Sequence, residues 1–215
     1  LARDGITLVE RPTEGAAENL RLLMDPKSGV DVAFVQGGLG AGASGVEMLA
    51  GLYHEALWVF YRNGTTLSHL DQLRGKRIAI GPDGSGTRAF AEAVLAANDV
   101  TPRNSTLTPQ TTGDAIHALQ RGELDAAMLV GSAQGQAVSL ALRDPTLDLM
   151  SIVRADAYPR RFHFVTKLLL PAGAVDLAHN VPPDDVVLLG TTAMLVARED
   201  LPNPLVDLLL DAARD

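Results

Sequence analysis

The stretch RIAIGPDGSGTRAF, residues 77–90, has the pattern of a short strand, a glycine-rich turn and the start of a helix. Its first residues include branched apolar side chains, as in a buried strand, and residues 84–86 form the turn. After the turn, Phe90 and Val94 recur at the spacing of one helix face. We therefore predict strand, turn and helix in that order, which is the repeating unit of an α/β protein.

The same alternation continues away from this unit. Towards the N-terminus we expect strands over 5–10, 29–38 and 55–63, and a helix capped by Thr13 that contains the residues AENLRLLM. Strands that alternate with helices favour a parallel, doubly wound sheet with right-handed crossovers. In such a sheet, ligands bind beyond the carboxyl ends of the strands.

A weak internal repeat suggests two similar parts. The segments SGVDVAFVQGG around Asp31 and GELDAAMLVGS around Asp125 share a glycine, an aspartate, an apolar strand and a further glycine. Such units also recur by chance in α/β proteins. If the repeat is real, the chain has two lobes, and strands must cross between them because no low-complexity linker is present. The segments 55–63 and 191–200 are the expected hinge strands.

Composition excludes several classes of function. With 18 Lys and Arg against 26 Asp and Glu, the 215-residue chain has a formal charge of −8, opposite to that of a nucleic-acid-binding protein. The lack of cysteine excludes disulfides and thiolate metal sites. No apolar stretch reaches the roughly 18 residues of a membrane span. The opening residues LARDG have the pattern of a helix end, so we expect a segment upstream of this sequence.

The start of the helix near residue 86 is a candidate anion site. Unpaired backbone N–H groups and the helix dipole favour an anion there by about 0.3–1 kcal/mol. The hydroxyls of Ser85 and Thr87 add directed donors beside Gly86. Arg88 is able to hold a carboxylate through two parallel hydrogen bonds. The alternative is that Ser85 only caps the helix and that Arg88 lies along the surface.

Enzymatic functions have weaker support. Residues 84–89, GSGTRA, match the dinucleotide pattern G-x-G-x-x-A, but the acidic residue that this function needs is missing from residues 103–110. A P-loop is excluded because Lys76 precedes the glycines. The five histidines form no i, i+3 or i+4 pair, and no serine lies in a G-x-S-x-G turn. We predict no catalytic residue, no metal site and no cofactor, with a nucleotide-dependent oxidoreductase as an alternative.

Three further residues are candidates for a ligand site or for the core. Gln36 ends an apolar strand, where a polar side chain faces either solvent or a ligand. Tyr53 precedes the expected hinge strand and is suited to wall a pocket. Trp58 lies between branched and aromatic residues, and we expect it in the core.

The chain resembles the TAXI-type solute receptors of tripartite (TRAP) transporters, which are related to type II periplasmic binding proteins. The segments that carry the resemblance are PTEGAAENLRLL, GVDVAFVQ, LRGKRIAIGPDGSGTR, GELDAAMLV and LGTTAMLVAREDLP, in this order. It implies two doubly wound α/β lobes joined by hinge strands. One lobe comprises residues 1–62 and 192–215, and the other comprises residues 63–191. It also implies that the first strand and its glycine-rich loop lie upstream of Leu1.

The resemblance further implies a receptor that is not an enzyme. It would bind a small carboxylate, an amino or hydroxy acid, between the lobes and deliver it to membrane transporter subunits. The location would be periplasmic or otherwise extracytoplasmic, with any membrane anchor outside this sequence, and nucleic acid is not an expected partner. A ligand-sensing module of a larger protein is an alternative.

Two positions depart from the family pattern. Ala16 stands where many members have a hydroxyl residue, and the loop 131–134 lacks the proline that is common there. Together, the residue patterns and the resemblance predict a set of ligand-binding residues, which is Thr13, Gln36, Tyr53, Ser85, Gly86, Thr87, Arg88, Gly131 and Ser132.

Overall fold

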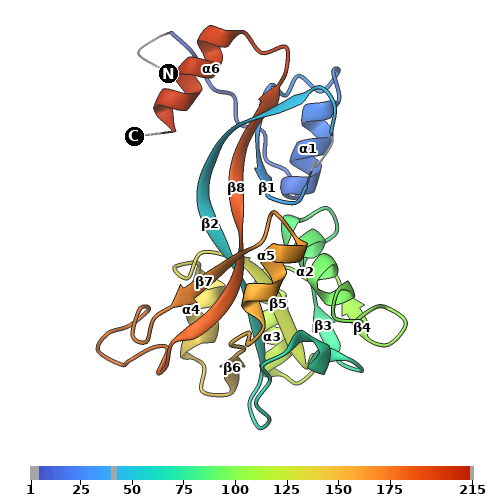
Figure 1. Ribbon diagram of the computed structural model, residues 1–215, viewed down its shortest axis with the longest axis vertical. Helices are drawn as coiled ribbons and strands as arrows, with labels where there is room; N and C mark the ends of the chain where they lie inside the picture. Colours follow the sequence, from blue (N-terminus) through green and yellow to red (C-terminus); the bar gives the residue numbers. More distant parts are fainter. Residues whose placement is uncertain (1–4, 40–42, 214–215) are drawn as a thin grey trace.

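The computed structural model describes residues 5–39 and 43–213. These residues form one mixed sheet with the strand order β1-β8-β2-β5-β3-β4, with β6 beside β2 and β7 beside β8 (Figure 1). The strands are β1 (Val32–Gln36), β2 (Val46–Arg62), β3 (Arg77–Ala79), β4 (Thr106–Thr108), β5 (Ala126–Gly131), β6 (Leu147–Leu149), β7 (Thr166–Leu170) and β8 (Val186–Arg198). The helices are α1 (Ala16–Met24), α2 (Gly86–Ala96), α3 (Thr112–Gln120), α4 (Gln136–Arg143), α5 (Tyr158–Arg161) and α6 (Asn203–Ala212), with short 3-10 turns η2 (Leu70–Leu73) and η3 (Ala155–Ala157).

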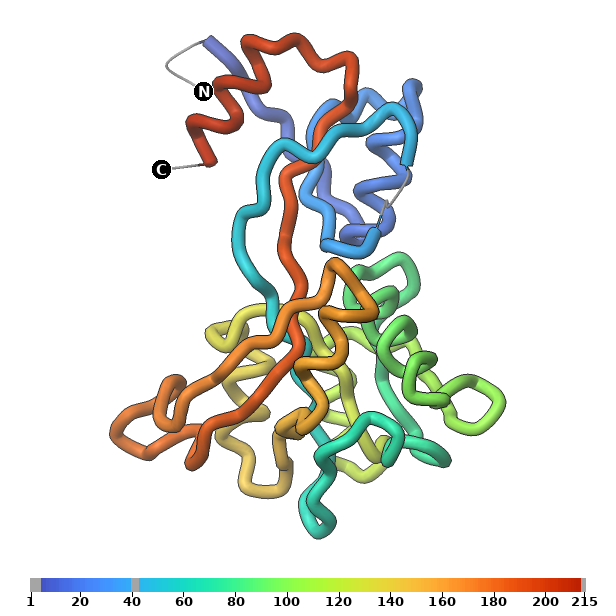
Figure 2. The backbone as a smooth tube through the Cα atoms, viewed as in Figure 1, coloured from blue at the N-terminus to red at the C-terminus, as the bar shows by residue number. Residues whose placement is uncertain are grey.

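The elements gather into two groups. The upper group contains α1, β1 and α6, and the lower group contains α2 to α5 with β3 to β7 (Figure 1). Strands β2 and β8 run side by side between the groups (Figure 2). They pair antiparallel from Val46 with Arg198 to Leu57 with Leu189. At about 3.3 Å per residue, β2 is long enough to belong to both groups.

The lower group has helices on both faces of its sheet. One core cluster packs Phe90 and Val94 of α2 against β2, β3 and β5, as the apolar spacing predicted. The second packs α3 and α4 against the opposite face and contains Trp58, which is 2% exposed, as predicted for a core residue. Parallel pairing is confined to β3 with β4 and β3 with β5 among the described strands. The remaining pairs are antiparallel, so the sheet is mixed instead of parallel throughout.

The two repeat segments contribute equivalent strands. β1 follows Asp31 and pairs with β8, whereas β5 follows Asp125 and pairs with β2. Both pairings are antiparallel, so these strands flank the central β2–β8 pair on its two sides. Each repeat strand therefore ends beside the junction of the upper and lower groups.

Two local predictions near the N-terminus are wrong. Residues 6–10 form no strand, because no neighbouring described strand pairs with them, and Leu8 and Val9 are 62% and 89% exposed. Thr13 does not cap α1, whose N-cap is Gly15 at φ 137° without a side-chain cap. Instead, the Thr13 hydroxyl donates to the Asn19 side chain and accepts from the Gly15 N–H. The described helices include none long and apolar enough to cross a membrane.

Candidate functional site

The starts of α1 and α2 meet at the junction between the upper and lower groups. The N–H of Ala17, in the first turn of α1, donates to the carbonyl of Gly84, just before α2, at 3.2 Å. Ser85 caps α2: its hydroxyl accepts from the Arg88 N–H at 3.2 Å and donates to the Pro82 carbonyl at 2.7 Å. We call the start of α1, the end of β1 and the start of α2 the α1–α2 corner.

Gln36 fills this corner from the end of β1. Its residue is 5% exposed, and its amide nitrogen Nε2 is buried without a hydrogen-bond partner among the described residues. The side chain lies so close to Gly86 that a Cβ built on this glycine would be 1.8 Å from Oε1 of Gln36. Only glycine therefore fits at position 86 while Gln36 keeps its place.

The backbone of the corner provides hydrogen-bond donors. The N–H groups of Gly86 and Thr87 have no hydrogen-bond partner in the described part of the chain. Two helices of 9 and 11 residues direct their positive ends towards this corner. The amide of Gln36 adds a further N–H donor. An arrangement of donors with few acceptors favours an anion.

The side chains of Thr87 and Arg88, which were expected to donate hydrogen bonds to a ligand, make other contacts. A Cβ on Gly81 would lie 2.8 Å from Cβ of Thr87, so this side chain packs onto the end of β3. The Arg88 guanidinium pairs with Asp83 and, at 2.9 Å, with Glu92. A bound anion would have to compete with these two carboxylates for Arg88. The Arg88 side chain is therefore arranged as in the alternative interpretation, in which it lies along the surface.

The remaining predicted residues flank the corner. Thr13 lies in the loop before α1, and its partner Asn19 donates to the Phe34 carbonyl of β1 at 2.8 Å. Tyr53 is 61% exposed on β2, opposite Ala193 of β8. The structure thus brings together Gln36, Ser85 and Gly86, whereas Thr13 and Tyr53 lie beside them on other elements.

The end of β5 lies beside the central pair. The Gly131 carbonyl accepts from Nε1 of Trp58 at 2.9 Å, and Gly131 pairs with Ala56 of β2. The exposed Ser132 uses its hydroxyl to accept from the Gln134 N–H at 3.2 Å. Both residues are therefore at the junction, where the Gly131 carbonyl and the Ser132 hydroxyl each already accept a hydrogen bond.

Two residues at the junction were not identified from the sequence. Phe164 packs against Gly38, where a Cβ would be 2.7 Å from the ring, and this makes a second contact between the groups. Glu55 lies on β2 opposite Thr191, and burial raises the pKa of its carboxyl group. An acidic residue directly before the apolar run ALWVF was the available signal for Glu55, whereas no local signal marked Phe164.

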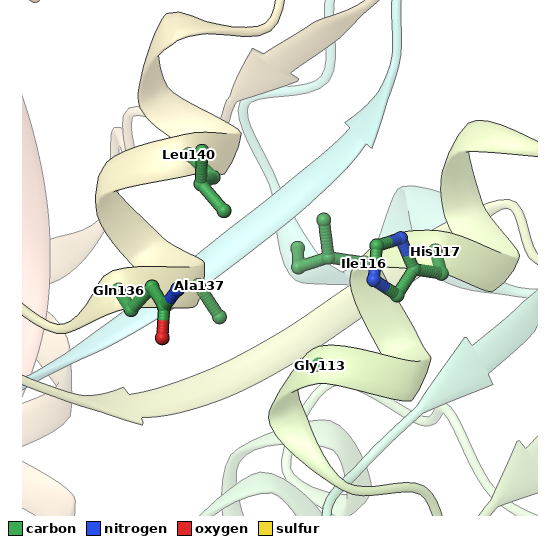
Figure 3. Close-up of a pocket in the computed structure, with 6 residues that line it drawn as sticks. All are labelled: Gly113, Ile116, His117, Gln136, Ala137 and Leu140. Atoms are coloured by element: carbon green, nitrogen blue, oxygen red, sulfur yellow. The ribbon is translucent and has the colours of Figure 1, made fainter.

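Two hollows lie apart from the corner. The larger one, about 440 Å³, lies between residues 37–38, residues 163–166 and the β2–β8 pair. The smaller one, about 220 Å³, lies between α3 and α4 of the lower group, where Ile116 of α3 faces Ala137 and Leu140 of α4 (Figure 3). Both are mostly apolar in their lining, so neither has the donor set of the α1–α2 corner.

Comparison with known proteins identifies a family and a fold. The profile of the NMT1-like family matches residues 2–213. The substrate-binding protein of an amino acid ABC transporter has a TM-score of 0.59 at 13% identity, over 99% of this chain and 75% of that chain. Holo ArgBP from T. maritima has a TM-score of 0.59 at 15% identity, over 99% and 74%. A hydrogen peroxide-bound mutant of OxyR from Corynebacterium glutamicum has a TM-score of 0.57 at 17% identity, over 93% and 53%. The fold is type II periplasmic binding protein-like.

Proposed function

This chain belongs to the NMT1-like family, and from that premise we propose that it is a non-enzymatic receptor that binds a small carboxylate at the α1–α2 corner. The observation that carries the proposal is the side chain of Gln36: its buried Nε2 has no hydrogen-bond partner among the described residues, and its Oε1 lies against Gly86 at the start of α2. Buried polar groups are nearly always hydrogen-bonded, so the unpartnered Nε2 of a side chain that lies beside a helix start indicates a missing acceptor.

The donor set favours a carboxylate over a neutral solute. The N–H groups of Gly86 and Thr87 and Nε2 of Gln36 are donors without a partner among the described residues, and the helix dipoles add positive potential there. A carboxylate supplies two oxygens that accept several such bonds at once. Charge-assisted hydrogen bonds of this kind are about twice as strong as neutral ones.

Binding would be coupled to motion of two lobes. We take residues 1–62 with 192–215 as one lobe and residues 63–191 as the other, with β2 and β8 as the hinge. Opening of the hinge would break the contact of Gln36 with Gly86. A ligand that enters the corner would then take over the donors there, and closure would enclose it.

Delivery to a membrane transporter is the role that best suits such a receptor. The named structural neighbours include a substrate-binding protein of an amino acid ABC transporter. The sequence resembles the TAXI-type receptors of TRAP transporters, so we propose a TRAP-type partner, an extracytoplasmic location and an amino or hydroxy acid as ligand. No cofactor or nucleic acid takes part in this function.

A thermal-shift screen of the purified protein against small organic acids tests the proposal. A ligand at 100 times its Kd stabilises the native state by about 2.7 kcal/mol. We expect a shift with at least one carboxylate and none with the matching amide or alcohol. Gly86→Ala should abolish the shift, whereas Gly113→Ala, where a Cβ meets nothing within 4 Å, should retain it. Equal shifts in both variants would contradict binding at this corner.

A ligand-sensing module of a larger protein is the second candidate. The observation that favours it is the match to OxyR, of which the aligned part is 53% of the chain. The same fold therefore also occurs as part of a longer polypeptide. An output domain on the same polypeptide, together with a ligand-dependent change in that domain's activity, would favour sensing over transport.

A further inference from the structure

Glu55 is a half-buried acid without a partner among the described residues, and it lies near the Leu57 end of the β2–β8 pairing. The described residues provide it with no side-chain hydrogen bond and no ion pair, unlike Asp125, which pairs with Arg77. Burial raises the pKa of Glu55, and no neighbouring cation offsets this effect. An ionised carboxylate that is partly buried in this way raises the free energy of the native state unless a cation lies close to it.

Strand register places Glu55 on the same sheet face as Gln36. Gln36 and Tyr53 both pair with Ala193 of β8, and Glu55 pairs with Thr191, two residues further along. Cross-strand partners project to the same face of a sheet, and so do residues two apart on one strand. Two strand spacings of about 4.8 Å and two residues of about 3.3 Å separate the Cα atoms of Gln36 and Glu55 by roughly 12 Å.

The same face is the one that α2 covers. Leu57, two residues after Glu55, lies in the core cluster that contains Phe90 of α2. Gly86, at the start of this helix, lies against Gln36. Glu55 is thus located next to the end of that core, on the sheet face between the α1–α2 corner and the end of β5. A ligand bound at the corner would reach Glu55 by extending along this face.

We propose that Glu55 contacts the positively charged nitrogen of the ligand, so that the receptor selects a carboxylate that also carries an ammonium or guanidinium group. The inference rests on the proposed function. The α1–α2 corner provides donors for the acidic end, and Glu55 provides the acceptor for the cationic end. The two sites have opposite charge and lie on one face, which is the arrangement that a zwitterion requires.

Matched ligand pairs test this selectivity. The probes are 4-aminobutyrate against 4-hydroxybutyrate and alanine against lactate, with Kd measured by calorimetry on the intact protein. In the wild type, the amino compound of one pair should bind at least about tenfold more tightly, the size of one charge-assisted bond in a half-buried site. Glu55→Gln should remove this preference while the hydroxy acid retains its affinity.

A second acid on the same strand provides the control. Glu47 is exposed on β2, and Glu47→Gln should leave both affinities unchanged. Retention of the amino preference in Glu55→Gln, or equal affinity for both members of each pair in the wild type, would overturn the role of Glu55 alone. Lack of binding by every acid would overturn the proposed function, and the role of Glu55 with it. The melting temperature of each variant establishes that it is folded.

Discussion

The contact between Gln36 and Gly86 predicts a strong coupling between the two positions. A Cβ at position 86 would lie 1.8 Å from Oε1, 2.8 Å from Cδ and 3.2 Å from Cβ of Gln36. Displacement of a side chain that is 5% exposed costs about 1–3 kcal/mol, as overpacked cores do. Against this, alanine in place of a helical glycine stabilises by about 0.5–1 kcal/mol. Gly86→Ala should therefore destabilise the wild type by about 1 kcal/mol.

The effect of Gly86→Ala on stability should have the opposite sign in a protein that also carries Gln36→Ala. The truncated side chain retains only the Cβ at 3.2 Å, which a shift of a few tenths of an ångström relieves. Gly86→Ala should then stabilise the protein by about 0.5–1 kcal/mol, which gives a coupling free energy of roughly 2 kcal/mol in the double-mutant cycle.

Urea denaturation of the four proteins measures this coupling, and small-angle scattering separates its two causes. If Gly86→Ala relieves the overlap by opening the hinge, the radius of gyration should increase in the single variant and return to the wild-type value in the double variant. Equal effects of Gly86→Ala in both backgrounds, with no change in the radius of gyration, would refute the placement of Gln36 against α2.

Three further predictions concern stability. Glu55→Gln should stabilise the protein at neutral pH, because a raised pKa in the native state means that folding disfavours the ionised carboxyl group. Urea denaturation at a series of pH values should show that this gain in stability vanishes below the ordinary pKa of glutamate. Asp125→Asn should cost about 1 kcal/mol at neutral pH, and because Arg77 lowers the pKa of Asp125, this difference should disappear only as the pH falls below the lowered value. Trp58→Phe should lower the free energy of unfolding, measured in urea, by about 2 kcal/mol, because the Gly131 carbonyl loses the indole donor and a void forms. A decrease below about 0.5 kcal/mol would contradict a stabilising role of this hydrogen bond.

Local patterns were sufficient for several elements. The strand, turn and helix around residues 77–96 follow from apolar spacing and from a serine that caps α2. The buried strand that ends at Gln36 and the core position of Trp58 follow from the same kind of pattern. Each of these features depends on neighbours within a few residues of the chain.

Local patterns were misleading where a distant partner decides the outcome. The apolar run at residues 6–10 has β propensity, but a strand also requires a neighbour, and the described strands provide none. The expected cap at Thr13 bonds instead to Asn19, which ties the loop to β1. Arg88 was expected to be free for a ligand, but Asp83 and Glu92 hold its guanidinium.

By itself, the amino-acid sequence determined the class of the fold, the helix start at Ser85 and the polar residue at the end of β1, because propensity, capping and apolar periodicity act over short distances along the chain. Only the tertiary structure decided that Gln36 lies against Gly86, that Glu55 shares the sheet face of Gln36 with no partner among the described residues, and that the two helix starts meet. Those facts depend on strand register and on side-chain contacts between residues that are far apart in the chain, from 50 positions for Gln36 and Gly86 to 157 for Gln36 and Ala193, which no local pattern specifies.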